Sequence, residues 1–580
     1  MHNLIETGKS KYFIVGSEFS DECDRYAASE LQKYIYRSTD VLMPYFAERC
    51  EKRGPEIMVG KGARGNFLTD EELNSITDEG FVIKSVEDNI FICGKTSRGT
   101  LYGVYTFLEK FFGFRAFTKD VEKIDTVDNL CLEELYIMES PAFEYRDAYF
   151  RNAFAGTFAA KAKLNSTLNY SSRTTGGNFK FYNCHHSFND LVPPAKYLKE
   201  HPEYYSLVEG ERKPIQLCLS NPDVLEIATE QVFKWIEENP HCKVFSVAQN
   251  DEVTETPHYC TCKECSEVDE YESSPSGSVI RFVNKICEKV CQKYPDVLIH
   301  TFAYTYSRIA PKHVKPHPNL IVRLANIECQ WDLPFAKVAE EKPESKSAEF
   351  LSNIAEWTKI SDRVYVWDYA VNFANYLQPF PVFHTLGENI KLYSKMGVKG
   401  LLEQGNFSYG GSAAMDDLKV YIMSKLMWNP KLDTQTLIDE FTEGVYGNGA
   451  LYIKEYIRLI SDMVKGKHMT LYDFPDSPYI TDEIVSKADD LFEKAKQAEE
   501  GETLRRIQRE RLSVEYLKTT RILDDALRAK AVDEFAKKVK SFKITEIMER
   551  IDLELSFEFL KRAPYARNRD GKYTVYYLMK

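Results

Sequence analysis

Short apolar runs alternate with amphipathic stretches in the first part of the chain. The strand-like runs are Tyr12–Val15, Glu56–Val59, Phe81–Lys84 and Asn89–Cys93. The helical stretches are Glu22–Tyr36 and Gly99–Phe112. This alternation predicts an N-terminal α/β domain over residues 1–137.

The pattern becomes more regular after Ser140-Pro141-Ala142, which punctuates the chain. Most of the apolar runs that follow are separated by amphipathic helices. These runs are Phe143–Tyr149, Asn165–Tyr170, Phe179–His185, Lys243–Asn250, Leu298–Tyr304, Leu320–Asn326, Arg363–Tyr369 and Val398–Gln404. Such βα repeats predict a (β/α)₈ TIM barrel over residues 138–432, with its reacting groups at the carboxyl ends of the strands.

Helix signals mark the segments between the runs. Asn221-Pro222 supplies an N-cap and a first-turn proline for a helix that reaches Trp235. The spacing of Val279, Phe282, Val283, Ile286 and Val290 predicts one buried stripe of another helix. Only helical patterns follow, so residues 433–580 are expected to form a C-terminal α-helical domain. The charges over Glu502–Lys530 are typical of a solvated helical face.

Composition narrows the class of function. The 580-residue chain has a net charge of −13, which argues against nucleic acid or an anionic membrane surface as a partner. No stretch approaches the length of a membrane span. The first residues lack a signal-peptide pattern, and thirteen cysteines suit a reducing compartment, so a cytoplasmic location is expected. A secreted protein whose leader had been trimmed would look the same.

Polar and aromatic residues collect where the predicted barrel strands end. Because parallel strands are usually apolar throughout, these ends predict a pocket on one face. The residues are Cys184-His185-His186, Gln249-Asn250-Asp251-Glu252, Tyr304-Thr305-Tyr306, Trp367-Asp368-Tyr369 with Asn372, and Glu403-Gln404-Gly405-Asn406.

Asp251 and Glu252 carry the sharpest chemical signal. Two adjacent carboxylates at a strand end can reach one cleft, and ionising both costs Coulomb energy, so the pKa of one is raised. A carboxylic acid that stays protonated near neutral pH can protonate the leaving oxygen of a glycoside. The alternative for such a dipeptide is a solvated loop or a helix N-cap.

A cysteine cluster follows the two carboxylates. Cys260, Cys262 and Cys265, with His258 nearby, have the ligand types of a structural zinc site. A second cysteine pair at a distance would make that signal strong, and no such pair is obvious in the sequence. Zinc would pin the acid-bearing loop, and catalysis itself would need no cofactor. His185, His186 and His300 are each candidates for sugar binding, or for a place in the core.

Several motifs together resemble known carbohydrate-active families. Residues Thr96–Glu109 and Phe112–Arg115 resemble the N-terminal α/β domain that precedes the barrels of hexosaminidases and α-glucuronidases. The barrel is similar to glycoside hydrolase family 163, endo-β-N-acetylglucosaminidases acting on N-glycans and related to family 20. That similarity covers residues 80–432 and rests on His201–Tyr205, Gln216–Pro222, Gln249–Glu252, Cys260–Cys265, Phe282–Asn284, Ala303-Tyr304, Trp367–Tyr369 and Glu403–Gly405.

The resemblance implies a retaining, substrate-assisted mechanism in which the 2-acetamido group of the substrate attacks the anomeric carbon. Glu252 would then be the general acid and base, and Asp251 would orient the acetamide. The residues expected to contact the oligosaccharide are Arg146, His186, Asn250, Tyr304, Trp367, Asp368, Tyr369 and Gln404.

Three other functions stay open at this stage. They are an exo-acting β-hexosaminidase, an α-glucuronidase, and a non-catalytic carbohydrate-binding protein that kept the barrel. A glucuronidase would need a basic pocket for the uronate carboxylate. The relatives usually carry a secretion signal, and a cytoplasmic enzyme would instead meet short imported glycans.

Overall fold

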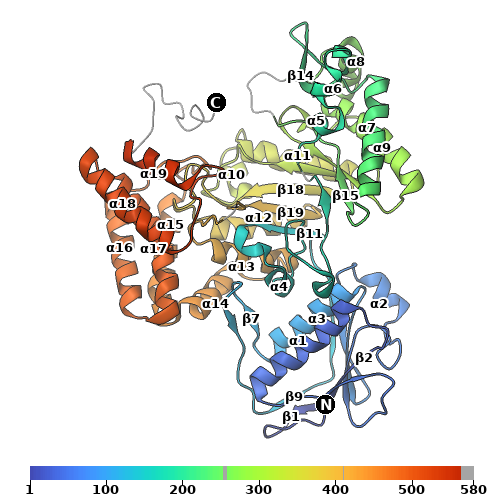
Figure 1. Cartoon of the computed structure of the whole chain (residues 1–580), viewed down its shortest axis with the longest axis vertical. Helices are drawn as coiled ribbons and strands as arrows, with labels where there is room; N and C mark the ends of the chain where they lie inside the picture. Colours follow the sequence, from blue (N-terminus) through green and yellow to red (C-terminus); the bar gives the residue numbers. More distant parts are fainter. Residues whose placement is uncertain (184, 252–257, 409, 563–580) are drawn as a thin grey trace.

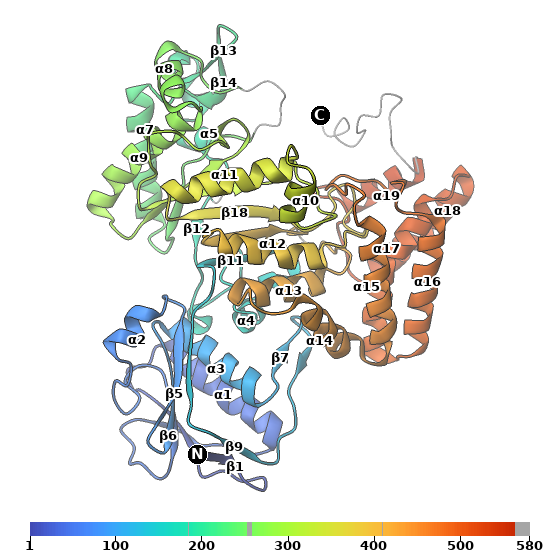
Figure 2. The same ribbon diagram turned by 180° about the vertical axis from the view of Figure 1, so that it is seen from behind.

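The computed structural model describes residues 1–183, 185–251, 258–408 and 410–562. Figures 1 and 2 show an N-terminal α/β part, a central parallel sheet, and a group of helices at the end of the chain. A further lobe, which contains α7, α8 and α9, stands on the other side of the central sheet from the terminal helices (Figure 1). No helix among the described residues is long and apolar enough to span a membrane.

The N-terminal part is built on a six-stranded mixed sheet in the order β10-β5-β6-β4-β2-β3. Its strands are β2 (Phe13–Gly16), β3 (Tyr45–Ala47), β4 (Glu56–Val59), β5 (Phe81–Val86), β6 (Asn89–Gly94) and β10 (Tyr136–Glu139). Its helices are α1 (Glu22–Thr39), α2 (Asp70–Ser75) and α3 (Ser97–Phe111). The predicted strands and helices of this part are therefore confirmed, with ends shifted by up to three residues.

The central sheet has seven parallel strands that curl into a half-barrel in the order β11-β19-β18-β17-β16-β15-β12. The strands are β11 (Tyr145–Tyr149), β12 (Phe181–Tyr182), β15 (Val244–Ser246), β16 (Leu298–Ala303), β17 (Leu320–Ala325), β18 (Val364–Tyr369) and β19 (Gly400–Gln404). Every neighbouring pair in this sheet is parallel. All carboxyl ends consequently lie along one edge.

The second of the eight expected strands, Asn165–Tyr170, is not a strand. Asn165 makes one main-chain hydrogen bond to each neighbouring segment, and polar side chains supply others: the Asn165 Oδ1 accepts from the Arg146 N–H at 2.9 Å, and the Thr167 hydroxyl accepts from the Phe181 N–H at 3.0 Å. Asn, Ser and Thr side chains compete in this way with regular ladders. The segment thus contacts both β11 and β12 without pairing as a strand, and closure of an eight-stranded barrel stays a prediction.

Helices cover the outer side of the sheet (Figure 2). They include α4 (Gly156–Lys161), α7 (Pro222–Glu238), α9 (Ser276–Lys293), α10 (Phe335–Glu341), α11 (Lys346–Ile360), α12 (Phe383–Lys395) and α13 (Asp416–Trp428). The Asn221 side chain caps α7 by accepting from two backbone N–H groups, and the predicted stripe of α9 is buried. Both local predictions are confirmed.

The described residues after 433 contain helices and no strand. These helices are α14 (Thr434–Tyr446), α15 (Ala450–Val464), α16 (Asp482–Gln497), α17 (Gly501–Thr520), α18 (Asp525–Ser541) and α19 (Leu553–Arg562). The Arg509 guanidinium of α17 pairs with the Asp416 carboxylate at the start of α13, at 2.7 Å. The division of the chain at residues 137 and 432 stays a prediction.

Candidate functional site

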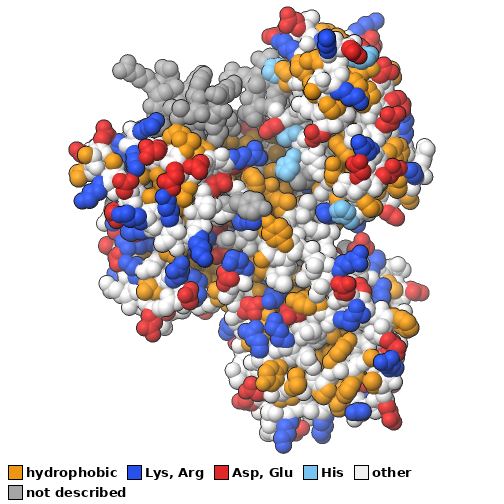
Figure 3. Space-filling model, viewed as in Figure 1, with side chains coloured by type: hydrophobic (Ala, Val, Ile, Leu, Met, Phe, Trp, Pro, Cys, Tyr) orange, Lys and Arg blue, Asp and Glu red, His pale blue; other side chains and the backbone are white. Residues whose placement is uncertain are grey.

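A hollow lies at the edge where the carboxyl ends of the parallel strands meet. Figure 3 shows histidine side chains next to hydrophobic ones in this hollow, between the α7–α9 lobe and the terminal helices. The residues at the ends of the strands along this edge, or in the segments just after them, include Tyr149, His185, His186, Asp251, Tyr304, Trp367, Tyr369 and Gln404. Six of these eight residues were predicted from the sequence as site residues; Tyr149 was missed and His185 was left as an open candidate.

Trp367 occupies the middle of this group. Its indole N–H donates to the Gln404 Oε1 at 2.8 Å, which fixes the plane of the ring. The rings of His185, Phe302 and Tyr149 surround it, with centroids 5.8, 6.0 and 6.2 Å away. Aromatic faces held in this way suit the apolar face of a sugar ring.

His186 connects the aromatic group to Asp251. Its Nδ1 lies 2.5 Å from the Gln249 carbonyl oxygen, which can only accept, so Nδ1 carries the proton. The other ring nitrogen, Nε2, lies 3.6 Å from the Asp251 Oδ1 and carries no proton in the neutral ring. In the neutral ring this nitrogen can accept a hydrogen bond from a sugar hydroxyl, and in the protonated ring it forms an ion pair with Asp251.

The main chain just before Asp251 is held by a side chain from another element. Gln216 is the last residue but one of β14 (Glu211–Leu217), which forms a hairpin with β13 (Tyr205–Val208). Its Oε1 accepts from the Asn250 N–H at 3.0 Å, and its Nε2 donates to the Asn250 carbonyl at 3.0 Å. This pair of bonds fixes the direction in which the chain leaves β15.

Asn250 itself contributes its side chain to the scaffold. Its Nδ2 donates to the Ile215 carbonyl at 2.7 Å and to the Asn189 Oδ1 at 3.0 Å. Its Oδ1 also accepts from the Asn189 N–H, so the side chain expected to bind substrate already makes three hydrogen bonds to two residues of the protein.

Glu252, the predicted general acid, lies outside the described residues. Its neighbour Asp251 is described, and 63% of the Asp251 side chain is exposed. Burial raises the pKa of Tyr369 well above its usual value, and the negative charge of Asp251 is among the weaker causes that add to it. That electrostatic contribution agrees with Asp251 and Tyr369 facing one hollow.

Two histidines, the partly buried His185 and the fully buried His300, stay neutral. Burial, with a smaller contribution from the positive charge of Arg323, lowers the pKa of His185 to about 4. The same causes lower the pKa of His300 well below its usual value, and His300 accepts or donates at the Ser246 hydroxyl, 2.9 Å away. At neutral pH, His185 therefore presents an uncharged ring to the hollow.

Arg323 lies in the sheet interior, where it is fully buried. None of its three guanidinium nitrogens has a hydrogen-bond partner in the described residues, and its charge is surrounded by rings. The ring centroids of Phe181, Tyr145, Tyr365 and Trp367 lie 4.9–5.8 Å from it. Nothing in the periodicity of its strand, which is buried throughout, indicated this residue.

Arg146 does not join the group at the strand ends. It lies on the opposite side of β11 from Tyr145, with no exposed surface, and its guanidinium pairs with Glu79 of the N-terminal part. It also donates to the Lys163 and Phe143 carbonyl oxygens at 2.7 and 2.8 Å. This placement corrects the expectation that Arg146 holds sugar hydroxyls, since all of these partners are protein groups.

Asp368 also points away from the hollow, into the helix layer. Its carboxylate accepts from Tyr393 of α12 at 2.7 Å, from Asn326 at 2.8 Å and from the Trp331 indole at 3.2 Å. Burial raises its pKa and raises that of Glu403 well above the usual value. The expected sugar contact of Asp368 is therefore corrected to a buried structural role.

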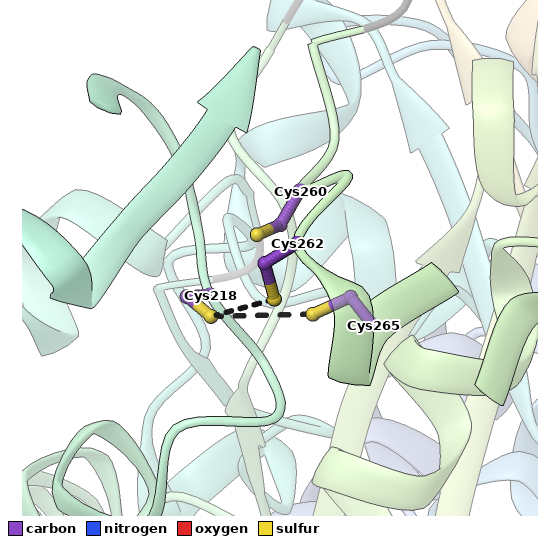
Figure 4. Close-up of side chains that lie close together, drawn as sticks. All are labelled: Cys218, Cys260, Cys262 and Cys265. Carbon is purple, nitrogen blue, oxygen red and sulfur yellow. Dashed lines mark hydrogen bonds between the residues drawn. The ribbon is translucent and has the colours of Figure 1, made fainter. Parts of the chain in front are cut away.

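The three predicted cysteines lie together with a fourth, Cys218, which sequence analysis did not select. Figure 4 shows the four side chains pointing toward a common centre. All four are buried, and their sulfur atoms lie within 4.8 Å of one another. Cys218 follows β14, 42 positions before Cys260, and it has no cysteine close to it in sequence that would have marked it.

Comparisons with known proteins agree on the fold. Residues 116–458 match the family described as "Domain of unknown function (DUF4838)", and residues 11–107 match "Glycosyl hydrolase family 67 N-terminus". No curated protein matches the chain in sequence. The second match shows that the N-terminal part is similar to the N-terminal region of glycoside hydrolase family 67, whereas no comparison identifies family 163.

Among solved structures, a family GH115 4-O-methyl-α-glucuronidase with specificity for decorated arabinogalactans is 10% identical. It has a TM-score of 0.56 over 93% of this chain and 77% of the other. A GH138 enzyme targeting pectin rhamnogalacturonan II is 11% identical, with a TM-score of 0.47 and 93% of each chain covered. The first likeness shows that this chain has a glycoside hydrolase-like fold.

Proposed function

The chain belongs to the DUF4838 family, and on that premise we propose that it is a glycoside hydrolase that uses Glu252 as its general acid. The observation that carries this proposal is the position of Asp251 in the segment that follows the carboxyl end of β15, where it lies beside His186, whose ring packs near Phe302. In barrel-type enzymes this edge of the sheet is where catalytic residues lie. The glycoside hydrolase-like fold supports the same class of reaction.

The proposed substrate is a β-linked N-acetylglucosamine residue in an N-glycan-type oligosaccharide, cut in the endo mode. Its acetamide carbonyl oxygen attacks the anomeric carbon while Glu252 gives its proton to the leaving oxygen and the glycosidic C–O bond breaks. Water then attacks the oxazolinium intermediate and gives a proton back to Glu252, so the configuration is retained. Tyr304, Trp367 and Tyr369 supply an aromatic surround for the acetamide group.

The first experiment offers the full-length protein an N-glycopeptide, an aryl β-N-acetylglucosaminide and an aryl α-glucuronide, with products identified by mass spectrometry. A cut between the two core N-acetylglucosamine residues supports the endo reading. Replacing the acetamide of the substrate by a trifluoroacetamide, whose carbonyl oxygen is a weaker nucleophile, should slow a substrate-assisted enzyme steeply. A rate that does not respond to this change contradicts the substrate-assisted step.

The acid assignment predicts the result of one conservative substitution. Glu252→Gln should lower kcat by about 10²–10⁴-fold, the usual contribution of general acid–base catalysis, and leave glycan affinity nearly unchanged. Glu270→Gln, an exposed acid on α8 (Lys263–Glu272), is the matched control and should keep wild-type activity. Kinetics and calorimetric binding measure the two effects, and full activity of Glu252→Gln would refute the assignment.

An exo-acting α-glucuronidase is the second candidate. Two observations favour it: the solved structure described as a 4-O-methyl-α-glucuronidase, and the exposed Arg550, whose guanidinium carbon lies 5.9 Å from the Phe407 ring centroid. Phe407 stacks on Tyr149 at 4.7 Å, so this cation lies near the hollow and suits a uronate carboxylate. Release from the aryl α-glucuronide alone, lost in Arg550→Gln, would select this function.

A third outcome of the same panel is binding without turnover. If the protein binds a glycan but releases no product from any of the three substrates, both enzymatic proposals are contradicted. The protein would then be a carbohydrate-binding protein.

A further inference from the structure

Four buried thiols come together from two separate segments of the α7–α9 lobe (Figure 4). Cys218 follows the β13–β14 hairpin, and Cys260, Cys262 and Cys265 lie just before and within the first turn of α8. None of the four is more than 5% exposed. They form a small hydrophobic cluster of their own, apart from the main core.

The spacing of the sulfur atoms is that of a metal tetrathiolate. The Cys218 sulfur lies 3.7 Å from that of Cys262 and 4.0 Å from that of Cys265. A tetrahedral ion with zinc–sulfur bonds of about 2.3 Å holds its sulfurs roughly 3.8 Å apart. A disulfide would require about 2.05 Å, so these thiols are not placed as a bonded pair.

Hydrogen-bond donors surround the cluster. The Leu207 N–H and the Arg212 guanidinium donate to the Cys260 sulfur at 3.4 and 3.6 Å. The Ser220 hydroxyl donates to the Cys265 sulfur at 3.1 Å. Thiolates bound to a dication keep excess negative charge, and donors of this kind, above all a guanidinium, stabilise it.

We propose that Cys218, Cys260, Cys262 and Cys265 bind one Zn²⁺ ion as a closed structural site. Zinc suits the set because it takes four thiolates in tetrahedral geometry without redox chemistry. Four protein ligands leave no open position for water, so the ion does not take part in the reaction. It joins two segments that no disulfide among the described residues connects.

The ion holds the hairpin that carries Gln216 against the segment that follows Asp251. Cys218 lies two residues after Gln216, and the Thr261 N–H and hydroxyl bond the Leu207 carbonyl of the same hairpin, at 2.9 and 2.7 Å. Gln216 in turn bonds both main-chain groups of Asn250. The effect of the ion on catalysis rests on the proposed function, whereas its binding does not.

The test measures metal in the full-length protein purified without chelator. Elemental analysis and native mass spectrometry are expected to give one zinc per chain, released by a mercurial thiol reagent. Absence of metal in the wild-type protein, four thiols titrating freely in the folded state, or one iron with visible colour would each overturn the zinc assignment. These readouts do not require activity.

Substitutions locate the site. Cys218→Ser and Cys262→Ser should each lower the zinc content by at least about tenfold and reduce the thermal midpoint, because binding energy of a structural ion is folding energy. Cys291→Ser on α9 is the matched control, since this partly buried cysteine lies outside the cluster, and it should keep one zinc. Equal zinc loss in the control would overturn the assignment, and inactive wild-type protein with full zinc would count only against the proposed function.

Discussion

At the scale of single residues, the site consists of polar groups whose positions are set by partners from other strands. The Trp367 indole is fixed by Gln404, and the His186 ring is fixed by the Gln249 carbonyl. Neighbouring residues in the same strands, such as Asp368, face the helix layer. The sequence placed functional residue types at the strand ends, and the fold then divided them between the two faces.

His185 predicts a pH dependence of stability. Its pKa is lowered to about 4 in the folded protein, from 6.5 for an exposed histidine, so between these pH values the unfolded chain binds the extra proton. Stability should therefore fall as pH falls from about 6.5 to 4, by roughly 1–2 kcal/mol for this partly exposed ring. Thermal midpoints of wild type and His185→Gln across this range measure it, and parallel curves for the two proteins would contradict it.

At the scale of elements, the β13–β14 hairpin supports the segment between β15 and Asp251. It carries Gln216, which holds Asn250, and it leads directly to Cys218. The Asn165–Tyr170 segment was predicted to be a strand from its sequence pattern. In the structure it is not a strand, and polar side chains make hydrogen bonds to the neighbouring strands. The strands and helices with a clear periodicity of apolar residues could be predicted from the sequence. The structure of a segment held by side-chain hydrogen bonds could not.

The hairpin predicts a positioning role for Gln216. Gln216→Met removes two hydrogen bonds from the main chain before Asp251, so kcat should fall about tenfold or more while KM changes little. Stability should fall by about 1–3 kcal/mol because buried peptide groups lose their partners. Glu211→Gln, an exposed change in the same strand, is the control. A variant with wild-type kcat, or a loss confined to KM, would exclude the positioning role.

At the scale of the whole molecule, ion pairs join the N-terminal part of the chain to the central part. Arg146 of β11 pairs with Glu79 of the N-terminal part, and Lys425 of α13 pairs with Glu109 at 2.6 Å. Burial opposes ionisation of Glu109, but Lys163 and Lys425 lower its pKa to about 2, so it is charged at neutral pH. Such buried pairs hold the N-terminal part against the central sheet.

The Arg146→Met variant is therefore expected to lose stability and to keep its affinity for substrate. It removes one partner of the buried Glu79, although Arg98 lies 3.4 Å from the same carboxylate, so a cost on the order of 2–4 kcal/mol is expected. KM of the folded fraction should stay unchanged. Thermal unfolding and steady-state kinetics on the same samples decide the matter, because a raised KM at an unchanged midpoint would restore the sugar-binding role.

The sequence by itself determined the alternation of strands and helices, the capped helix starts, and the chemistry that collects after the strands. These follow from local periodicity and side-chain types. Only the tertiary structure decided that Arg146 and Asp368 face away from the hollow, because strands buried on both faces leave no polar alternation to read. It alone brought Gln216 to Asn250 and Cys218 to the other three thiols, since contacts across 34 and 42 positions depend on how separate elements pack.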